Sequence, residues 1–271
     1  MTARRVLVVG GGDVGSAVAH QLFLRGMKVL VSEREHSAHA RRGMAFTDAL
    51  FDGSAQLEGV AAKHVPDPQA VERCWQAADC IPVVTMAESL LTAAMRFDVV
   101  VDATMRREDR RRDLRDMATC TIGLGPGYEP GINCHIAIET QWGPLMGQVL
   151  RDHGTAARAG GPHPLDGITR ERFVVAPHAG VWRTTATLGQ PVRRADVIGH
   201  VDEDAVLAPI AGHLRGLTRD GVAVMADQRL LEVDPRAMPE LAGLGERPLA
   251  IAHGVVSALA LQRQATDRDD C

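Results

Sequence analysis

Three glycines near the start of the chain have the spacing of a phosphate-binding turn. Gly10, Gly12 and Gly15 fit the pattern G-x-G-x-x-G, and they follow a β-branched run at residues 6–9. In this pattern the first glycine allows a tight turn, the second lets the backbone approach a pyrophosphate, and the third allows close packing of helix and strand. The helix that follows presents N–H groups and the positive end of its dipole to an anion. The turn therefore predicts a nucleotide-binding site.

Two carboxylates belong to the same predicted site. Glu33 ends the next apolar run, 18 residues after Gly15, where such folds place the carboxylate that binds ribose hydroxyls. Asp13 lies inside the turn, beside the expected phosphate. Its carboxylate either caps the first turn of the helix or excludes a dinucleotide, and the motif leaves both open. Because Arg34 follows Glu33, the choice between NAD and NADP is also open.

The elements that must position these residues alternate along the first part of the chain. Strand-like runs at 60–65, 81–85 and 98–103 are separated by helix-like runs at 68–78 and 87–96. This alternation is typical of a parallel sheet with helices on both faces. We therefore expect an α/β fold with a Rossmann-like nucleotide-binding domain over residues 1–150. Residues 106–116 carry many charges of both signs and are expected to form a solvated helix.

A second glycine-rich stretch follows a predicted strand at residues 120–131. Its candidate ligand-binding glycines are Gly123, Gly125 and Gly127, because successive N–H groups in such turns can form an anion-binding nest. Carboxyl ends of parallel strands meet at one sheet edge, so this loop should lie beside the first turn. A purely structural turn is the alternative. Asp102, near the end of the strand at 98–103, is a candidate for holding a sugar or a metal-bound water at the same edge.

Residues 132–140 alternate between apolar and polar side chains, which predicts a strand. On a strand His135 and Glu139 share one face but lie about 13 Å apart. They cannot form an acid–base pair, so each is a candidate for contacting a ligand singly. Catalytic residues stay unassigned, with His135, Glu139 and Asp102 as candidates. Cys134 lies on the apolar face and is expected to be a buried structural thiol.

The second half of the chain contains an internal repeat. The segment 176–183 (APHAGVWR) recurs 32 residues later as 208–215 (APIAGHLR), and the same offset pairs further apolar and glycine positions. Two such copies should pack as one small all-β domain over residues 171–236. This domain resembles the barrel-sandwich hybrid of biotinyl and lipoyl carriers. Because Lys28 and Lys63 are the only lysines, we expect no covalent biotin or lipoate. Residues 237–271 are expected to pack back on a domain.

Composition excludes several classes of partner. A net charge of −4 and 3 % aromatic residues argue against nucleic-acid binding. No apolar run reaches the length of about 18 residues that a membrane helix needs. The first strand begins after five residues, which leaves no room for a signal peptide, and the cysteines form no C-x-x-C pair. We expect a cytoplasmic protein with no metal site, because the histidines and cysteines lack metal-ligand spacing.

Over nearly its whole length the chain resembles the accessory proteins of selenium-dependent molybdenum-hydroxylase systems, the YqeB-type family. The run 123–127 followed by His135 and the segment 138–140 carries the resemblance most specifically. The other matching stretches are 10–13 with 19–20, 41–42 with Phe46, 101–103, the two Ala-Pro-x-x-Gly repeats, 216–217 and 233–236.

The resemblance implies a role in the maturation of molybdenum hydroxylases. The ligand is then expected to be a nucleotide or dinucleotide, with molybdopterin cytosine dinucleotide and NAD(P) as candidates, and the partner a molybdenum-hydroxylase client enzyme. Two alternatives stay open. One is an NAD(P)-dependent oxidoreductase, for which His135 or His178 would have to donate a proton. The other is a non-catalytic protein that senses a nucleotide and docks on a partner. A homo-oligomer is compatible with the sequence.

Overall fold

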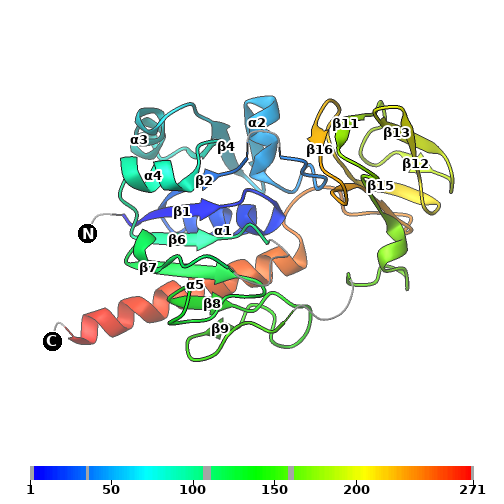
Figure 1. Cartoon of the computed structure of the whole chain (residues 1–271). Helices are drawn as coiled ribbons and strands as arrows, with labels where there is room; N and C mark the ends of the chain where they lie inside the picture. Colours follow the sequence, from blue (N-terminus) through cyan, green and yellow to red (C-terminus); the bar gives the residue numbers. More distant parts are fainter. Residues whose placement is uncertain (1–2, 35–36, 106–110, 158–161, 270–271) are drawn as a thin grey trace. The chain divides into compact units, whose positions relative to one another are not determined.

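The computed structural model describes residues 3–34, 37–105, 111–157 and 162–269, and it divides into two compact units (Figure 1). Unit 1 comprises residues 1–34, 45–159 and 244–271. Unit 2 comprises residues 35–44 and 160–243. The short segment 35–44 therefore belongs to unit 2, although unit 1 surrounds it in the sequence.

Within the described residues, unit 1 is built on a nine-stranded sheet with the order β3-β4-β5-β2-β1-β6-β7-β8-β9. The outer pairs β3·β4 and β8·β9 are antiparallel and all other neighbours are parallel. This mostly parallel sheet confirms the expected α/β class. The strands are β1 (Arg5–Val9), β2 (Lys28–Ser32), β3 (Ser54–Leu57), β4 (Val60–His64), β5 (Cys80–Val84), β6 (Val99–Asp102), β7 (Cys120–Leu124), β8 (Ile136–Ile138) and β9 (Val149–Leu150).

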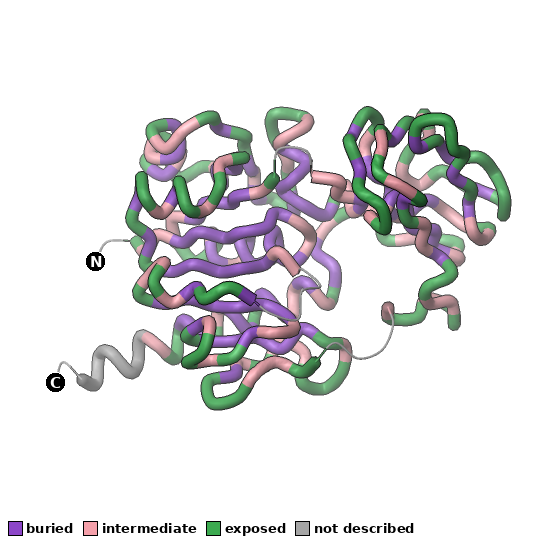
Figure 2. Tube along the Cα trace, in the orientation of Figure 1, coloured by how far each residue is buried: buried purple, intermediate pink, exposed green. Residues whose placement is uncertain are grey.

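Helices cover both faces of this sheet because its central strands are apolar on both sides. In β1, Val6 and Val8 pack with α1 (Asp13–Phe23) and α5 (Glu246–Asp269). Leu7 and Val9 face the other way, into the core formed with α3 (Pro68–Ala77) and α4 (Glu88–Ala94). Figure 2 shows the central strands buried. A short helix α2 (Ala49–Asp52) precedes β3.

The order in which strands are added to the sheet reverses at β1, and this point marks the candidate site. From β1 the chain passes to β2 on one side, and it later returns to β6 on the other side. Val9 and Asp102, the last residues of β1 and β6, are register partners. In open α/β sheets ligands bind outside the carboxyl ends of strands at such a point. The turn containing Gly10 lies there.

Unit 2 contains two four-stranded antiparallel sheets in the part of the chain that the structure describes. Sheet 1 has the order β10-β17-β15-β12 and sheet 2 the order β14-β13-β11-β16. The strands are β10 (Phe173–Val175), β11 (Gly180–Arg183), β12 (Pro191–Val192), β13 (Val197–Val201), β14 (Asp204–Leu207), β15 (Gly212–Leu217), β16 (Ala223–Val224) and β17 (Arg229–Asp234).

A shift of 32 residues exchanges the two sheets of unit 2. It maps β10, β17, β15 and β12 onto β14, β13, β11 and β16, in the order that sheet 2 has. The register follows as well, since the pair Gly180↔Val224 corresponds to Val192↔Gly212. Each sheet thus mixes strands from both copies. The repeat could not have formed two separate halves, because each copy completes the sheet of the other.

Two predicted elements differ from the structure. The strand expected at 132–140 is confined to Ile136–Ile138, because residues 129–134 form a turn that Asn133 closes by bonding to Glu129 and Gly127. For the helix expected at 106–116, residues 106–110 lie outside the described part. Residues 111–116 form no α-helix, and Arg111 is buried rather than solvated. No helix among the described residues combines the length and apolarity needed to cross a bilayer.

Candidate functional site at the carboxyl edge of the large sheet

Two of the three glycines of the first turn are required by the packing of the protein itself. Gly10 has a φ of +97°, and a Cβ there would approach the Ala103 backbone to 2.9 Å. A Cβ on Gly15 would overlap the carbonyl oxygen of Gly10, so this glycine is needed for packing of α1 on β1. A Cβ on Gly12 would have no atom of the described residues within 4 Å. Gly12 is thus the one glycine of the motif that the protein's own packing does not require.

Asp13 turns its carboxylate toward the helix. Its Oδ1 accepts a hydrogen bond from the Val14 N–H at 2.9 Å, while Gly12, the N-cap residue, has no side chain to serve as a cap. This is the capping arrangement that the sequence left open for Asp13. The carboxylate satisfies one N–H of the first turn of α1, next to the open space at Gly12.

Glu33 lies directly after β2 and reaches the glycine turn. One carboxylate oxygen accepts the Gly11 N–H at 2.9 Å and the other accepts the Arg34 N–H at 2.7 Å. The side chain is half-buried. A carboxylate has about four acceptor positions, and the described residues use two of them, which leaves two for hydroxyl donors such as those of a ribose.

Two residues that the sequence reasoning missed hold this turn in place. Ser16 Oγ donates to the Gly11 carbonyl at 2.7 Å and accepts the Phe46 N–H at the same distance. The Thr47 N–H also donates to Gly11 O, at 3.3 Å. Thr47 Oγ1 is buried against Gly11 and has no hydrogen-bond partner among the described groups. Neither spacing nor residue type marked Ser16 or Thr47, because their role depends on the tertiary approach of residues 46–47.

Asp102 lies beside the turn at the end of β6. Its Oδ1 accepts both the N–H and the hydroxyl of Thr104, at 2.9 and 2.6 Å. The phenol of Tyr128 lies near this carboxylate, and its side chain is 1 % exposed. Burial, and secondly the negative charge of Asp102, raise the pKa of Tyr128. Asp102 is therefore held by its own loop next to a neutral phenol.

The second glycine-rich loop is fixed by bonds to its carbonyl oxygens. Those of Gly125, Pro126 and Gly127 accept hydrogen bonds from Thr155 Oγ1, Arg111 Nε and Asn133 Nδ2. The N–H of Gly125 donates to Ile138, which continues the pairing of β7 with β8.

At each of these three positions the backbone conformation or the packing of the loop favours glycine. A Cβ on Gly123 would overlap the ring of Tyr128, and Gly125 and Gly127 have φ values of +94° and +85°. These observations agree with the structural-turn alternative for residues 123–127.

His135 and Glu139 lie at different ends of β8. His135 precedes the strand and aligns with Thr121, whose N–H and hydroxyl contact its Nδ1 at 3.1 and 2.8 Å. Because β7 and β8 are parallel, His135 lies at the amino end of the sheet, away from Gly10 and Gly12. Glu139 is buried and accepts the N–H groups of Thr140, Gln141 and Ala156 at 2.7–2.8 Å. His135 is therefore not brought to the first turn, whereas Glu139 lies at the carboxyl edge with its carboxylate bonded to these three N–H groups.

The cysteines near this region are unsuited to nucleophilic chemistry. Cys120 and Cys134 are both buried. Burial raises the pKa of Cys120, and raises that of Cys134 to about 12. Thiols with such pKa values are protonated at neutral pH. Among the described residues, no group of three His, Cys, Asp or Glu side chains has the geometry to hold a metal ion.

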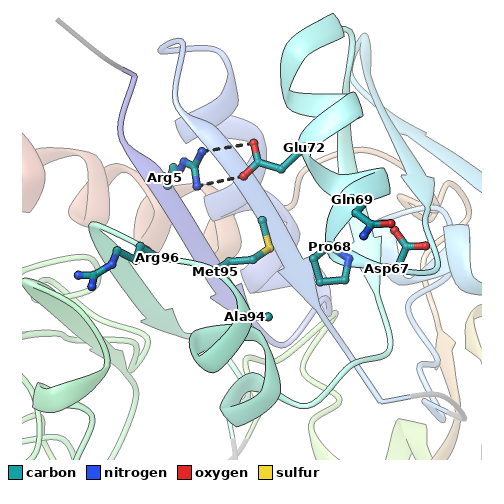
Figure 3. A pocket seen from close by; sticks show the side chains of 8 residues that line it. All are labelled: Arg5, Asp67, Pro68, Gln69, Glu72, Ala94, Met95 and Arg96. Atoms are coloured by element: carbon teal, nitrogen blue, oxygen red, sulfur yellow. Dashed lines mark hydrogen bonds and ion pairs between the residues drawn. The ribbon is translucent and has the colours of Figure 1, made fainter.

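A separate cavity of about 570 Å³ opens between α3 and α4 of unit 1 (Figure 3). Its walls include Met95, Arg96 and the ion pair of Arg5 with Glu72, whose nearest atoms are 3.0 Å apart. Arg5 also lies 5.2 Å from the centre of the Trp75 ring. Arg5 begins β1, so this wall lies at the opposite end of the strand from Gly10.

Comparison with known proteins finds a curated relative that matches most of this chain. The chain is 34 % identical over 257 residues to the uncharacterized protein YqeB of Escherichia coli K12, a match that covers 94 % of this chain and 47 % of YqeB. The chain is thus similar to YqeB over nearly its whole length. The chain spans about half the length of the curated relative it matches. No family model matches the sequence.

Solved structures show weak likeness. (S)-3-hydroxybutyryl-CoA dehydrogenase PaaH1 from Ralstonia eutropha is 13 % identical, covering 57 % of this chain and 56 % of that chain with a TM-score of 0.30. A succinylglutamate desuccinylase/aspartoacylase from Rhodobacter sphaeroides is 15 % identical, covering 88 % and 87 % with a TM-score of 0.26. TM-scores this low establish neither a shared fold nor a shared activity.

Proposed function

We propose that unit 1 binds a nucleotide or dinucleotide at the turn between β1 and α1. The open space at Gly12 is the observation that carries this proposal. Gly10 and Gly15 are required by packing, whereas Gly12 has ordinary backbone angles (φ −62°, ψ −175°) that any residue can adopt, and no atom of the described residues lies near its missing Cβ. A ligand that approaches the backbone closely would explain a glycine there.

The surrounding groups suit a phosphorylated ribose. The N-terminal turn of α1 offers N–H donors and a positive dipole end to a phosphate, and Glu33 retains free acceptor positions for ribose hydroxyls. A 2′-phosphate on that ribose would face the Glu33 carboxylate. NAD-type ligands are therefore expected to bind better than their NADP counterparts.

In the wider role that we propose, the protein is an accessory factor in the maturation of molybdenum hydroxylases, and the ligand is molybdopterin cytosine dinucleotide or a related nucleotide. Support for this role comes from the YqeB-type resemblance. Asp102, beside the turn and fixed by Thr104, is the side chain that we expect to contact the part of the ligand beyond the phosphates.

The melting temperature in the presence of NAD(H), NADP(H), CTP or purified molybdopterin cytosine dinucleotide tests the proposal. A ligand at about one hundred times its Kd adds about 2.7 kcal/mol of stability, which is a readily measured shift. A shift with CTP or the pterin dinucleotide alone supports the maturation role. A shift with NAD(H) alone favours a dehydrogenase instead, and no shift with any of them contradicts nucleotide binding.

A further inference from the structure

The outer faces of the two sheets in unit 2 differ although the 32-residue repeat makes them equivalent. In sheet 1, Glu232 of β17 is buried, because Arg41, Arg172 and Arg215 contact its carboxylate at 3.0–3.2 Å. The residue equivalent to Glu232 in sheet 2 is His200 of β13, which is exposed. One face is covered and its counterpart is open.

A segment that is neither helix nor strand covers sheet 1. Residues 37–44, which we name the cover, supply Arg41 and place the Ala40 carbonyl where it accepts the Leu217 N–H at 2.7 Å. The Gly43 carbonyl accepts the N–H of Gly243 in the same unit. The cover thus adds a backbone bond at the end of β15 and an ion pair to β17.

The corresponding positions of sheet 2 lack such a segment. Thr185, the counterpart of Leu217, is exposed, and its N–H finds no acceptor among the residues the structure describes. Apolar side chains are exposed on strands β13, β14 and β11 of this sheet. Val197 and Leu207 are register partners and are 58 % and 43 % exposed, and Val181 of β11 is 36 % exposed. Exposed apolar groups on neighbouring strands are typical of interaction surfaces.

The two faces differ in charge at the position that Arg41 of the cover contacts. Sheet 1 presents a carboxylate at position 232, and the cover brings an arginine to it. Sheet 2 presents His200 at the equivalent position and the exposed Arg183 at the position equivalent to Arg215. Arg183 has one exposed ionic partner, Asp220, at 3.6 Å. The segment that complements sheet 2 should therefore carry a carboxylate where the cover carries Arg41.

We propose that the outer face of sheet 2, formed by β11, β13 and β14, binds an extended segment of a partner protein. This segment places a carboxylate near His200 and Arg183 and apolar side chains on Val197 and Leu207. It takes the place relative to sheet 2 that residues 37–44 take relative to sheet 1.

The test uses the full-length protein with methyl-labelled valine and leucine and two synthetic peptides. The first has the sequence of residues 37–44 with Arg41 replaced by Glu, and the second keeps Arg41. We expect the acidic peptide to shift the methyl signals of Val181, Val197 and Leu207 saturably, and to bind at least fivefold more tightly than the basic one.

Two variants make the test specific. Val197→Arg copies the arginine that sheet 1 carries at the equivalent position 229, so it should fold, and it should weaken binding of the acidic peptide at least fivefold. Met238→Arg, at another exposed position of unit 2, should bind as the parent does. Equal binding of both peptides, or no saturable shift at these methyls, would overturn the proposal. A concentration-dependent dimer that Val197→Arg disrupts would overturn it too, because the occupant would then be a second copy.

Discussion

The Glu33 carboxylate accepts the N–H of Gly11 at 2.9 Å, so the residue that follows β2 is tied to the turn that follows β1. The proposed ribose acceptor and the proposed phosphate site therefore form one rigid group. This bond also fixes the side chain of Glu33 before any ligand arrives, which lowers the entropic cost of binding.

Replacing Glu33 should show how much the ribose and the phosphates of a nucleotide each contribute to its binding affinity. Glu33→Ala removes hydrogen bonds to a charged acceptor, each worth about 1.5–3 kcal/mol. We expect NAD⁺ or CTP to bind at least tenfold more weakly, while the affinity for inorganic pyrophosphate changes less than twofold. Isothermal titration calorimetry measures both, with the exposed Glu203→Ala as the control. An unchanged affinity for every ribose-containing ligand would exclude Glu33 from the site.

Gly15 and Gly12 should respond to alanine in opposite ways. Gly15→Ala forces a methyl group into the Gly10 carbonyl, and overpacking of this kind costs about 1–3 kcal/mol. Gly12→Ala meets open space and should change the free energy of unfolding by less than about 1 kcal/mol. Urea unfolding monitored by circular dichroism compares the two variants. Equal destabilisation by both substitutions would mean that the space at Gly12 is not open.

The packing of Tyr128 on Gly123 predicts a strong coupling between these residues. Gly123→Ala should destabilise unit 1 by about 2–3 kcal/mol in the parent, and by much less in a Tyr128→Ala background. A double-mutant cycle from urea unfolding gives the coupling energy. Additive effects would contradict this contact.

Much of unit 1 could be predicted because its signals are local. The glycine spacing, the apolar runs and Asp67 followed by Pro68 at the start of α3 all lie within a few residues of the feature they specify. His135 shows where prediction from local signals fails. The alternation at 132–140 suggested one long strand, but Asn133 closes a turn there, and so His135 lies at the amino end of β8. Such a side-chain bond to the backbone competes with strand pairing.

Unit 2 shows the same division between local and long-range information. The 32-residue repeat indicated a single β-domain, yet its spacing could not reveal that the two copies exchange strands between sheets. The role of Arg41 was equally hidden, because its partner Glu232 lies 191 residues away. Contacts of that range depend on the completed fold.

The buried Glu232 makes the stability of unit 2 depend on pH. Burial opposes its ionisation most strongly, yet the charges of Arg41 and Arg215 and the bond from Arg172 together hold the pKa of Glu232 below its usual value. A pKa below that of the unfolded chain, about 4.3, means that ionised Glu232 stabilises the fold above this pH. That stability is lost as the pH falls through the folded-state pKa.

Glu232→Gln should therefore lower the free energy of unfolding of unit 2 at pH 7. Between pH 5 and the pH at which the protein unfolds in acid, this free energy should depend less on pH in the variant than in the parent. Removing one partner of a buried ion pair costs about 3–5 kcal/mol. Urea unfolding followed at Trp182, with Trp75 and Trp142 replaced by Phe, isolates this unit. The exposed Asp204→Asn is the control. A variant with the parent's stability at pH 7 would contradict the role of Glu232 as the counter-ion of these arginines.

Binding by the parent protein and by Gly12→Ala, compared by isothermal titration with NAD⁺, CTP and molybdopterin cytosine dinucleotide, tests nucleotide binding most directly. We expect the parent to bind at least one of the three, and Gly12→Ala to bind it at least tenfold more weakly while melting within a few degrees of the parent. Equal affinities in the two proteins, or no heat of binding with any ligand in the parent, would contradict a nucleotide site at this turn.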